Sequence, residues 1–171
     1  LTVNPNTICS TSTIGSTIGA TESQVGCAGS ADDDVWFSFV ATSTIQTITV
    51  TPNTLYDAVL EIFSGTCGSL ISIACQDATI NYSPETRTVS GLTIGSTYYV
   101  RVYSYFSSTG DRGSFSMCVT TPYDPCSSIT SISGCGTVTN TTIPNGTGTY
   151  TGSACGNSTP GIEQIYSYTP T

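Results

Sequence analysis

Short runs of alternating apolar and polar residues recur along the chain, separated by turns rich in Gly, Pro, Asn and Ser. Alternation with a period of two is typical of a strand with one buried face, and many short strands at regular spacing are typical of a β-sandwich. No segment keeps a helical period over three turns. We therefore predict an all-β fold, an antiparallel sandwich of the jelly-roll or immunoglobulin-like type. The predicted strands are 14–18, 35–41, 47–51, 58–63, 70–75, 87–89, 97–105 and 114–119.

The pattern starts again after residue 125. Residues 121–125 contain two prolines, which break strand pairing, so we predict a linker there. Residues 164–171 align with residues 35–42, aromatic against aromatic, which indicates an internal repeat. We expect residues 1–120 to form one complete module and residues 126–171 a partial second one, too small to bury a core unaided.

The eight cysteines indicate a disulfide framework and an oxidising, extracellular environment. A zinc site would need histidines or closely spaced cysteine pairs, and the sequence has neither. The repeat alignment places Cys135 and Cys155 in the positions of Cys9 and Cys27, so we expect the same disulfide in each module. We pair each of the four remaining cysteines with its nearest remaining neighbour in the sequence. The predicted disulfides are Cys9–Cys27, Cys135–Cys155, Cys67–Cys75 and Cys118–Cys126.

Charge and composition exclude several classes of function. The net charge is −8 with three arginines, no lysine and no histidine, which argues against binding to nucleic acid or anionic lipid. No apolar run is long enough to span a membrane. Without histidine or lysine the usual nucleophile–base pairs cannot form, and only a pair of carboxylates remains for catalysis. We expect a protein that is not an enzyme and needs no cofactor.

The strand 97–105 has two distinct faces. Tyr98, Val100 and Val102 are expected to face the core, and a row of aromatic and basic residues is expected to face outward. Exposed aromatic side chains stack on sugars or anchor protein interfaces, whereas the alternative is ordinary packing across a sheet. The candidate binding face consists of Tyr99, Arg101, Tyr103 and Tyr105.

Two further patterns are candidate sites. Asp32, Asp33 and Asp34 supply hard oxygen ligands for calcium, with Asp57 or Asp77 as further ligands, but no calcium-loop spacing is present and a solvated acidic turn is the favoured alternative. Four asparagines match the acceptor pattern for N-linked glycans, which is no strong excess over the two or three that such a Ser/Thr-rich chain should give by chance. They are Asn81, Asn140, Asn145 and Asn157.

Several blocks of residues resemble a known family. The blocks 32–42, 56–68, 91–102 and 113–119 are similar, in this order, to repeats of large secreted proteins of Bacteroidetes, and together they resemble the pre-peptidase C-terminal type of β-sandwich. The resemblance implies a non-catalytic module that aids secretion, adhesion or substrate binding, sometimes with bound calcium. Such repeats open with a cysteine like Cys126, and none precedes Leu1, so Cys118 lacks the partner that the family implies.

The N-terminus repeats an internal strand. Residues 1–7 agree with residues 48–54 at five of seven positions, and 48–54 is the strand that the second, partial module lacks. Leu1, Thr2 and Val3 are therefore candidate donors of a strand to the next molecule, which would give a linear polymer. The alternative is that residues 1–7 open their own module within a longer array.

These observations lead to two functional hypotheses. The first is an extracellular structural protein, a subunit or repeat of a surface adhesin or filament, whose partner is itself or a glycan. The second is a carbohydrate-binding accessory module of a secreted hydrolase.

Overall fold

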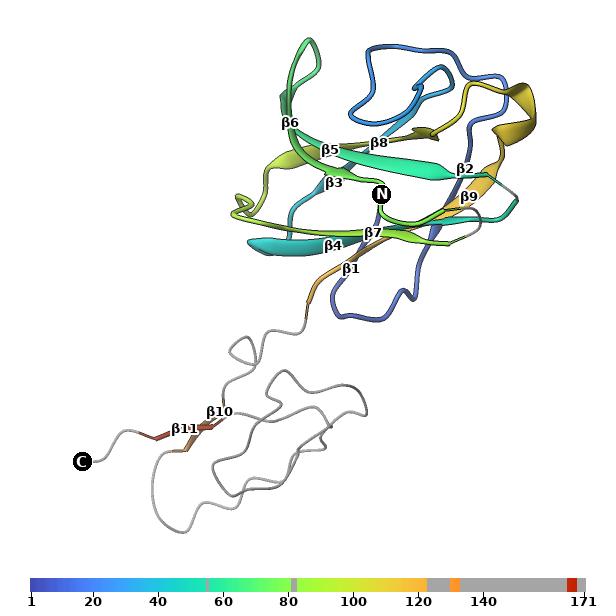
Figure 1. Cartoon of the computed structure of the whole chain (residues 1–171). Helices are drawn as coiled ribbons and strands as arrows, with labels where there is room; N and C mark the ends of the chain where they lie inside the picture. Colours follow the sequence, from blue (N-terminus) through green and yellow to red (C-terminus); the bar gives the residue numbers. More distant parts are fainter. Residues whose placement is uncertain (55, 81–82, 123–129, 133–165, 169–171) are drawn as a thin grey trace. The chain divides into compact units, whose positions relative to one another are not determined.

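The computed structural model describes residues 1–54, 56–80, 83–122, 130–132 and 166–168. The chain divides into two compact units, Leu1–Pro122 and Tyr123–Thr171, and the division falls within the segment 121–125. The first unit is a sandwich of two β-sheets that pack face to face (Figure 1). The prediction of an all-β sandwich is confirmed.

The eight predicted strands are all present, each within three residues of its expected ends. One more strand, β1, is only two residues long, too short to show a period. The elements of the first unit are β1 (Val3–Asn4), β2 (Thr13–Ser16), β3 (Val35–Val40), β4 (Ile45–Pro52), β5 (Ala58–Thr66), β6 (Ser69–Gln76), β7 (Glu85–Ser90), β8 (Thr97–Ser104), the 3₁₀ helix η1 (Thr109–Asp111) and β9 (Ser114–Thr120).

The two sheets differ in the number of their strands and in the direction in which the strands pair. One contains β3, β8, β5 and β6 in that order, and all of its neighbours are antiparallel. The other has the order β1-β9-β4-β7, and β2 also pairs with β9. Among the described strands of this unit, only β1 and β9 pair in parallel, with Val3 opposite Val119. The first and last strands of the unit are therefore neighbours.

The core lies between the sheets and follows from the alternation in the sequence. In β4, Ile48 and Val50 are fully buried, while the threonines between them face outward. Phe39 of β3 stacks on Tyr98, its partner on the neighbouring strand β8, with ring centroids 5.8 Å apart. Burying each large apolar side chain contributes about 1.5–3 kcal/mol, so these residues supply much of the stability of the module.

In the second unit, β10 (Thr130–Ile132) pairs in parallel with β11 (Tyr166–Tyr168). The strand β11 falls on the residues that the repeat alignment matches to 37–39 of β3. Several predicted features lie outside the described residues. These are Cys126, Cys135 and Cys155 and the candidate glycosylation positions Asn81, Asn140, Asn145 and Asn157.

The predicted disulfide pairing within the first unit is wrong. Cys9 bonds to Cys118 and Cys27 bonds to Cys75, with Cα–Cα distances of 6.0 and 6.1 Å. Cys67 is a free, exposed cysteine. Cys9–Cys27, Cys67–Cys75 and Cys118–Cys126 are therefore all corrected, and Cys118 has its partner inside its own module.

Strand geometry explains these corrections. Cys67 lies in the turn before β6, and Cys75 lies near the far end of that strand. The extended stretch from Ser69 to Cys75 alone separates its ends by about 20 Å, much farther than a disulfide can reach. Cys9 follows β1, and the pairing of β1 with β9 brings it to Cys118. Asn4 strengthens this junction, since its buried side-chain amide donates to the Val119 carbonyl at 3.0 Å and accepts from the Thr11 backbone N–H at 2.9 Å.

Candidate functional site

Residues 20–34, here called the strap, cross the outer face of the sheet that contains β8 (Figure 1). The strap has no regular strand or helix, and side chains of β8 and the Cys27–Cys75 disulfide hold it to the sheet. Gly29 allows the backbone of the strap to pass close to the backbone of Tyr105. It has a φ of +58°, and a Cβ atom there would lie 2.4 Å from the Tyr105 carbonyl oxygen.

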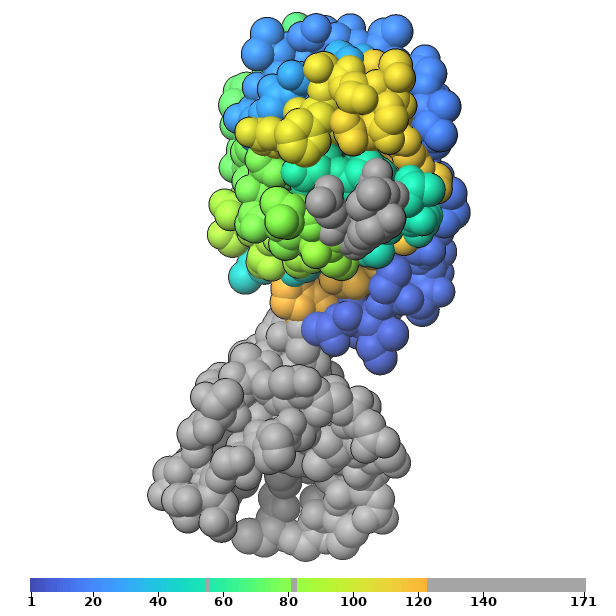
Figure 2. All heavy atoms as spheres, turned by 45° about the vertical axis from the view of Figure 1, so that its right-hand side comes forward, coloured from blue at the N-terminus to red at the C-terminus, as the bar shows by residue number. Residues whose placement is uncertain are grey.

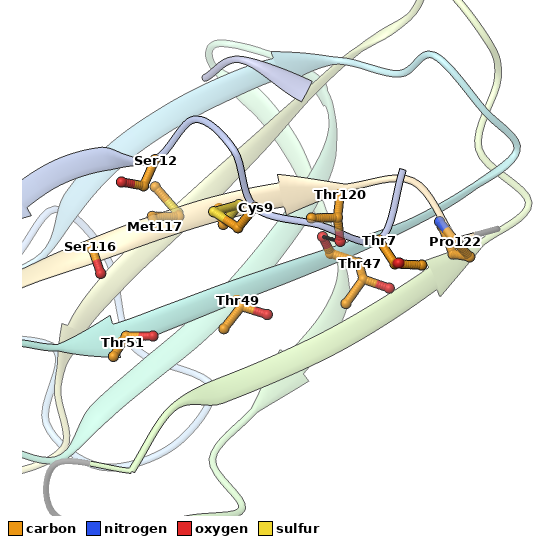
Figure 3. A pocket seen from close by; sticks show the side chains of 11 residues that line it. Thr7, Cys9, Ser12, Thr47, Thr49, Thr51, Ser116, Met117, Thr120 and Pro122 are labelled. Carbon is orange, nitrogen blue, oxygen red and sulfur yellow. Dashed lines mark hydrogen bonds between the residues drawn. A yellow bond between two sulfur atoms is a disulfide. The ribbon is translucent and has the colours of Figure 1, made fainter. Parts of the chain in front are cut away.

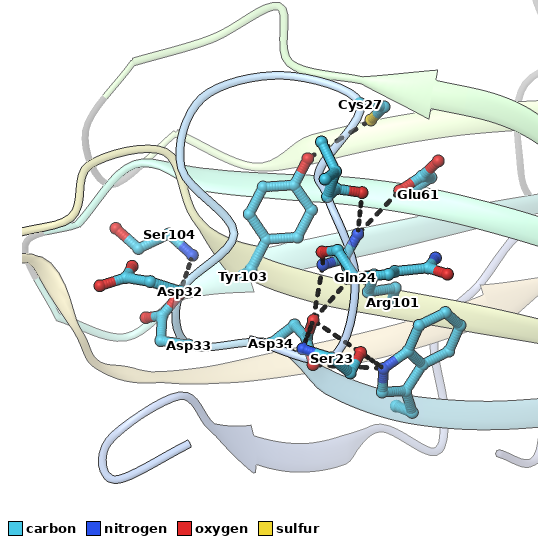
Figure 4. A network of polar contacts seen from close by, with 12 residues as sticks. Ser23, Gln24, Cys27, Asp32, Asp33, Asp34, Glu61, Arg101, Tyr103 and Ser104 are labelled. Atoms are coloured by element: carbon cyan, nitrogen blue, oxygen red, sulfur yellow. Dashed lines mark hydrogen bonds and ion pairs between the residues drawn. The ribbon is translucent and has the colours of Figure 1, made fainter. Parts of the chain in front are cut away.

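Arg101 on β8 is the centre of this contact (Figure 4). It is fully buried, and its guanidinium forms an ion pair with Asp34 and another, at 3.4 Å, with Glu61. It also donates to backbone carbonyls of the strap at Gln24 and Val25. A buried charge needs opposite charges and hydrogen bonds on all sides, and Arg101 has both.

Aromatic rings enclose the same guanidinium. Its carbon lies 4.8 Å from the centroid of the Tyr103 ring and 5.6 Å from that of Trp36. The Trp36 indole N–H donates to the Ser23 hydroxyl at 2.9 Å and to Asp34 at 3.2 Å. These cation–π contacts and hydrogen bonds join the strap, β3 and β8 into one network.

Tyr103 fastens the middle of the strap. Its hydroxyl donates to the Ala28 carbonyl at 2.9 Å and accepts from the Ala28 N–H at 3.1 Å, and it lies 3.5 Å from the Cys27 sulfur. Burial raises the pKa of this hydroxyl. The Tyr103 ring is fully buried and is not available to a ligand.

The predicted binding face is therefore wrong in its central residues. The alternation is right, since Tyr98, Val100 and Val102 face the core. The opposite row of Tyr99, Arg101, Tyr103 and Tyr105 does not face solvent as a whole, because the strap buries Arg101 and Tyr103. Tyr99 and Tyr105, at the two ends of the row, stay half-buried. Strand periodicity indicates which side of a sheet a residue takes, but it does not show what covers that side.

The three aspartates at the end of the strap all have partners within the module, and Arg112 lies 3.8 Å from Asp33 as well as pairing with Asp32. Asp34 pairs with Arg101, the buried Asp33 accepts the Ser104 N–H at 2.8 Å, and Asp32 pairs with Arg112 at 2.8 Å. Figure 2 shows this end of the unit, where the blue strap lies beside the yellow residues around η1. Arginines neutralise these carboxylates, which does not agree with the calcium hypothesis for Asp32, Asp33 and Asp34. The solvated-turn alternative does not fit either, because Asp33 and Asp34 are buried.

Burial of Asp33 raises the pKa of its carboxyl, and the hydrogen bond from Ser104 acts in the opposite direction. Among the described residues, no three His, Cys, Asp or Glu side chains are arranged to hold a metal ion.

Sequence reasoning missed a shallow groove on the outer face of the other sheet (Figure 3). It has a volume of about 380 Å³ and is lined by hydroxyl groups of β4 and β9 and by the Cys9–Cys118 disulfide. The strict alternation of Thr47, Thr49 and Thr51 with core residues was the signal that could have found it. Thr47 and Thr49 bond to threonines of β7 at 2.8 and 3.1 Å, so the hydroxyls are partly satisfied across the strands.

A second hollow, of about 480 Å³, lies where β5 ends and β8 begins. It is lined by residues 64–66 and 96–99 and includes Tyr99 of the predicted binding face. A hydrogen bond with the side chain of Cys67 raises the pKa of Tyr99. Neither lining includes a charged side chain. Both suit neutral hydroxylated ligands better than charged ones.

The chain matches no protein-family model and no curated protein sequence. The part of the chain that the structure describes contains no helix with the length and hydropathy of a membrane span. Two disulfides in one module are consistent with folding in an oxidising, extracellular environment.

Proposed function

We propose that this chain is a non-catalytic structural module of an extracellular protein, a subunit or repeat of a surface adhesin or filament. The observation that carries the proposal is the Cys9–Cys118 disulfide, which joins residues 109 positions apart at the two ends of the module. Tension that enters the chain before Cys9 and leaves it after Cys118 passes through this disulfide, here called the clamp. The sandwich between the two cysteines is then not loaded.

This arrangement suits a protein that must stay folded between two attachment points. The strap supports the same role. Arg101 and Tyr103 of β8 hold it to the sheet and are buried, so they are not exposed to a substrate. The chain also lacks histidine and lysine, the usual general bases. The resemblance to pre-peptidase C-terminal repeats, which occur in secreted and cell-surface proteins, supports the same proposal.

Single-molecule pulling between the two ends of Leu1–Pro122 tests the proposed role. In the oxidised protein we expect no large extension from this unit. After reduction of both disulfides, unfolding should release about 36–39 nm, the contour length of 109 residues. In an oxidised Cys9→Ser/Cys118→Ser variant the Cys27–Cys75 disulfide still holds back 48 of these positions, so only about 20–22 nm should be released. A Cys27→Ser/Cys75→Ser variant is the matched control, because its disulfide lies inside the clamped region. Full extension of the oxidised protein would contradict the proposal.

Assembly by strand donation is a separate part of the proposal. In the structure, Val3 pairs with β9 of its own chain, Leu1 and Val3 pack against the core, and the Leu1 amine donates to the Ser38 carbonyl. Donation therefore requires residues 1–3 to leave their own module, as in a domain swap, while the buried Asn4 stays as the anchor.

Deletion of residues 1–3 tests strand donation and leaves Asn4 in place. If these residues link one molecule to the next, electron microscopy should show polymers of the intact chain and none of the truncated one. Polymers that survive the truncation, or an intact chain that stays monomeric at high concentration, would exclude strand donation. The clamp would not be affected by either outcome.

A carbohydrate-binding accessory module is the alternative, and the uncharged, hydroxyl-lined groove and the hollow beside Tyr99 favour it. A glycan-binding screen separates the two functions. A monomer with measurable sugar affinity that is lost in Thr49→Val or Tyr99→Ala supports the alternative. A polymer without sugar affinity supports the structural role.

A further inference from the structure

The strand β6 forms one edge of the sheet β3-β8-β5-β6. One side of it pairs with β5 from Ser69 to Gln76, interrupted only at Ile73, and within the described residues no strand pairs with the other side. A strand edge of eight residues presents a row of unpaired N–H and C=O groups, which is a template for another strand.

The edge strands β7 and β3 carry features that limit such pairing, and β6 does not. On the edge strand β7, Arg87 is exposed and charged. At the β3 edge, the Leu1 amine donates a hydrogen bond to the Ser38 carbonyl, which is then not free to pair with another strand. Residues 62–76 contain no charged residue and no proline, and Ile71 and Ile73 are 64% and 41% exposed. Natural edge strands usually avoid this combination.

The bulge in the β5–β6 pair adds to this exposure. The register shifts between Ile62 and Phe63, so that Ala74 pairs with Ile62 and Ser72 with Phe63. Ile73 is left with no partner residue on β5. An apolar side chain in the middle of an open edge is thus available to a contact outside the module.

The distribution of charge favours a second copy of the same chain as the occupant. Each molecule has a net charge of −8, so most contacts between two copies bring like charges together. The hairpin 62–76 is a surface where they do not. If two β6 strands pair antiparallel with full overlap, Ser72 of one copy lies opposite Ile73 of the other. Asp77, the nearest following acid, then lies beside Gly68 of the other copy, and the two Asp77 residues are at opposite ends.

We propose that β6 pairs with β6 of a second copy, antiparallel about a two-fold axis, and joins the two sheets into one continuous sheet. The contact is isologous, since the same edge serves both partners. Backbone hydrogen bonds hold the strands together, and Ile71 and Ile73 of each copy lose exposed apolar surface. This pairing does not use residues 1–3 and is independent of strand donation and of the clamp.

The test measures association by sedimentation velocity as a function of concentration, in a Cys67→Ser background so that the free, exposed Cys67 cannot link two copies. We expect a concentration-dependent dimer. Ile73→Lys should weaken it by roughly tenfold or more, because an unpaired ammonium would enter the strand contact. Ile18→Lys is the matched control, since Ile18 is 69% exposed and lies away from this edge. Hydrogen exchange at high concentration should show added protection within residues 69–76.

Each possible result either supports or overturns the pairing of β6 with β6. A dimer that is weakened by Ile73→Lys, keeps its affinity in Ile18→Lys and in the chain without residues 1–3, and protects residues 69–76 supports the pairing. A chain that is monomeric at all concentrations overturns it. So does a dimer with unchanged affinity in Ile73→Lys, one weakened equally by Ile18→Lys, or one whose protected amides lie elsewhere. Circular dichroism of each lysine variant confirms that it is folded, as expected for substitutions at exposed side chains.

Discussion

At the scale of single residues, the side chains that resemble a binding site serve the fold. Arg101 is the clearest case, because a fully buried guanidinium is stable only with its carboxylates, carbonyls and aromatic rings in place. Its two carboxylate partners come from different segments, Asp34 from the strap and Glu61 from β5. The residue thereby fixes the strap to the sheet.

Replacing Arg101 with Met should reduce the free energy of unfolding by about 3–5 kcal/mol, because Asp34 and Glu61 would remain buried without their counter-charge. Denaturant unfolding measures this change. Arg87→Met is the matched control, since Arg87 is exposed, and it should change stability by less than about 0.5 kcal/mol. Equal effects of the two substitutions would contradict the account of Arg101.

A second group of acids shapes the dependence of stability on pH. Burial raises the pKa of Asp57, and the nearby charges of Asp77 and Glu85 raise it further. Burial and then Glu85 raise the pKa of Asp77. An Asp with a higher pKa in the folded state contributes stability that is fully present below its unfolded pKa of about 3.8 and is lost as the pH rises through the folded pKa.

We therefore predict that these acids make the free energy of unfolding fall as the pH rises above about 4. Asp77→Asn should make this fall shallower and raise stability near pH 7 by up to about 0.5 kcal/mol, because it removes one titrating group and one charge that acts on Asp57. Urea unfolding over this pH range gives the comparison. An unchanged slope in the variant would show that Asp77 does not act on Asp57.

At the scale of elements, the strap is the part of the module that depends most on one covalent bond. It has no backbone ladder of its own, and the Cys27–Cys75 disulfide closes a loop that spans 48 positions. The hydrogen bonds of Tyr103 and Arg101 act on the same segment. The disulfide keeps the strap near the sheet, and these side chains determine where it lies.

Loss of this disulfide in a Cys27→Ser/Cys75→Ser variant should cost about 4 kcal/mol, from the entropy of the longer open loop in the unfolded chain. We also expect faster proteolysis within residues 20–34 and faster exchange of the Ala28 amide, which Tyr103 holds at 3.1 Å. Cys67→Ser is the control, because Cys67 is a free, exposed cysteine. A variant as resistant to proteolysis as the parent would show that side-chain contacts alone hold the strap.

At the scale of the whole molecule, the sequence was a good guide to the strands and a poor one to what joins them. Alternation located β4 and β8 and the sides that they bury, because one buried face imposes a period of two. The strap and the disulfides depend on contacts between segments far apart in the chain, such as Arg101 with Asp34. No local pattern determines these contacts, and the two-residue β1, which brings Cys9 to Cys118, is too short to show one.

A peptide map of the non-reduced protein tests the central claim most directly. The account predicts one linked peptide that contains Cys9 with Cys118 and another that contains Cys27 with Cys75, and an alkylated, free Cys67. The first link is the clamp on which the proposed structural role depends. A map that joins Cys9 to Cys27, or that leaves Cys118 free, would remove the clamp and contradict the account.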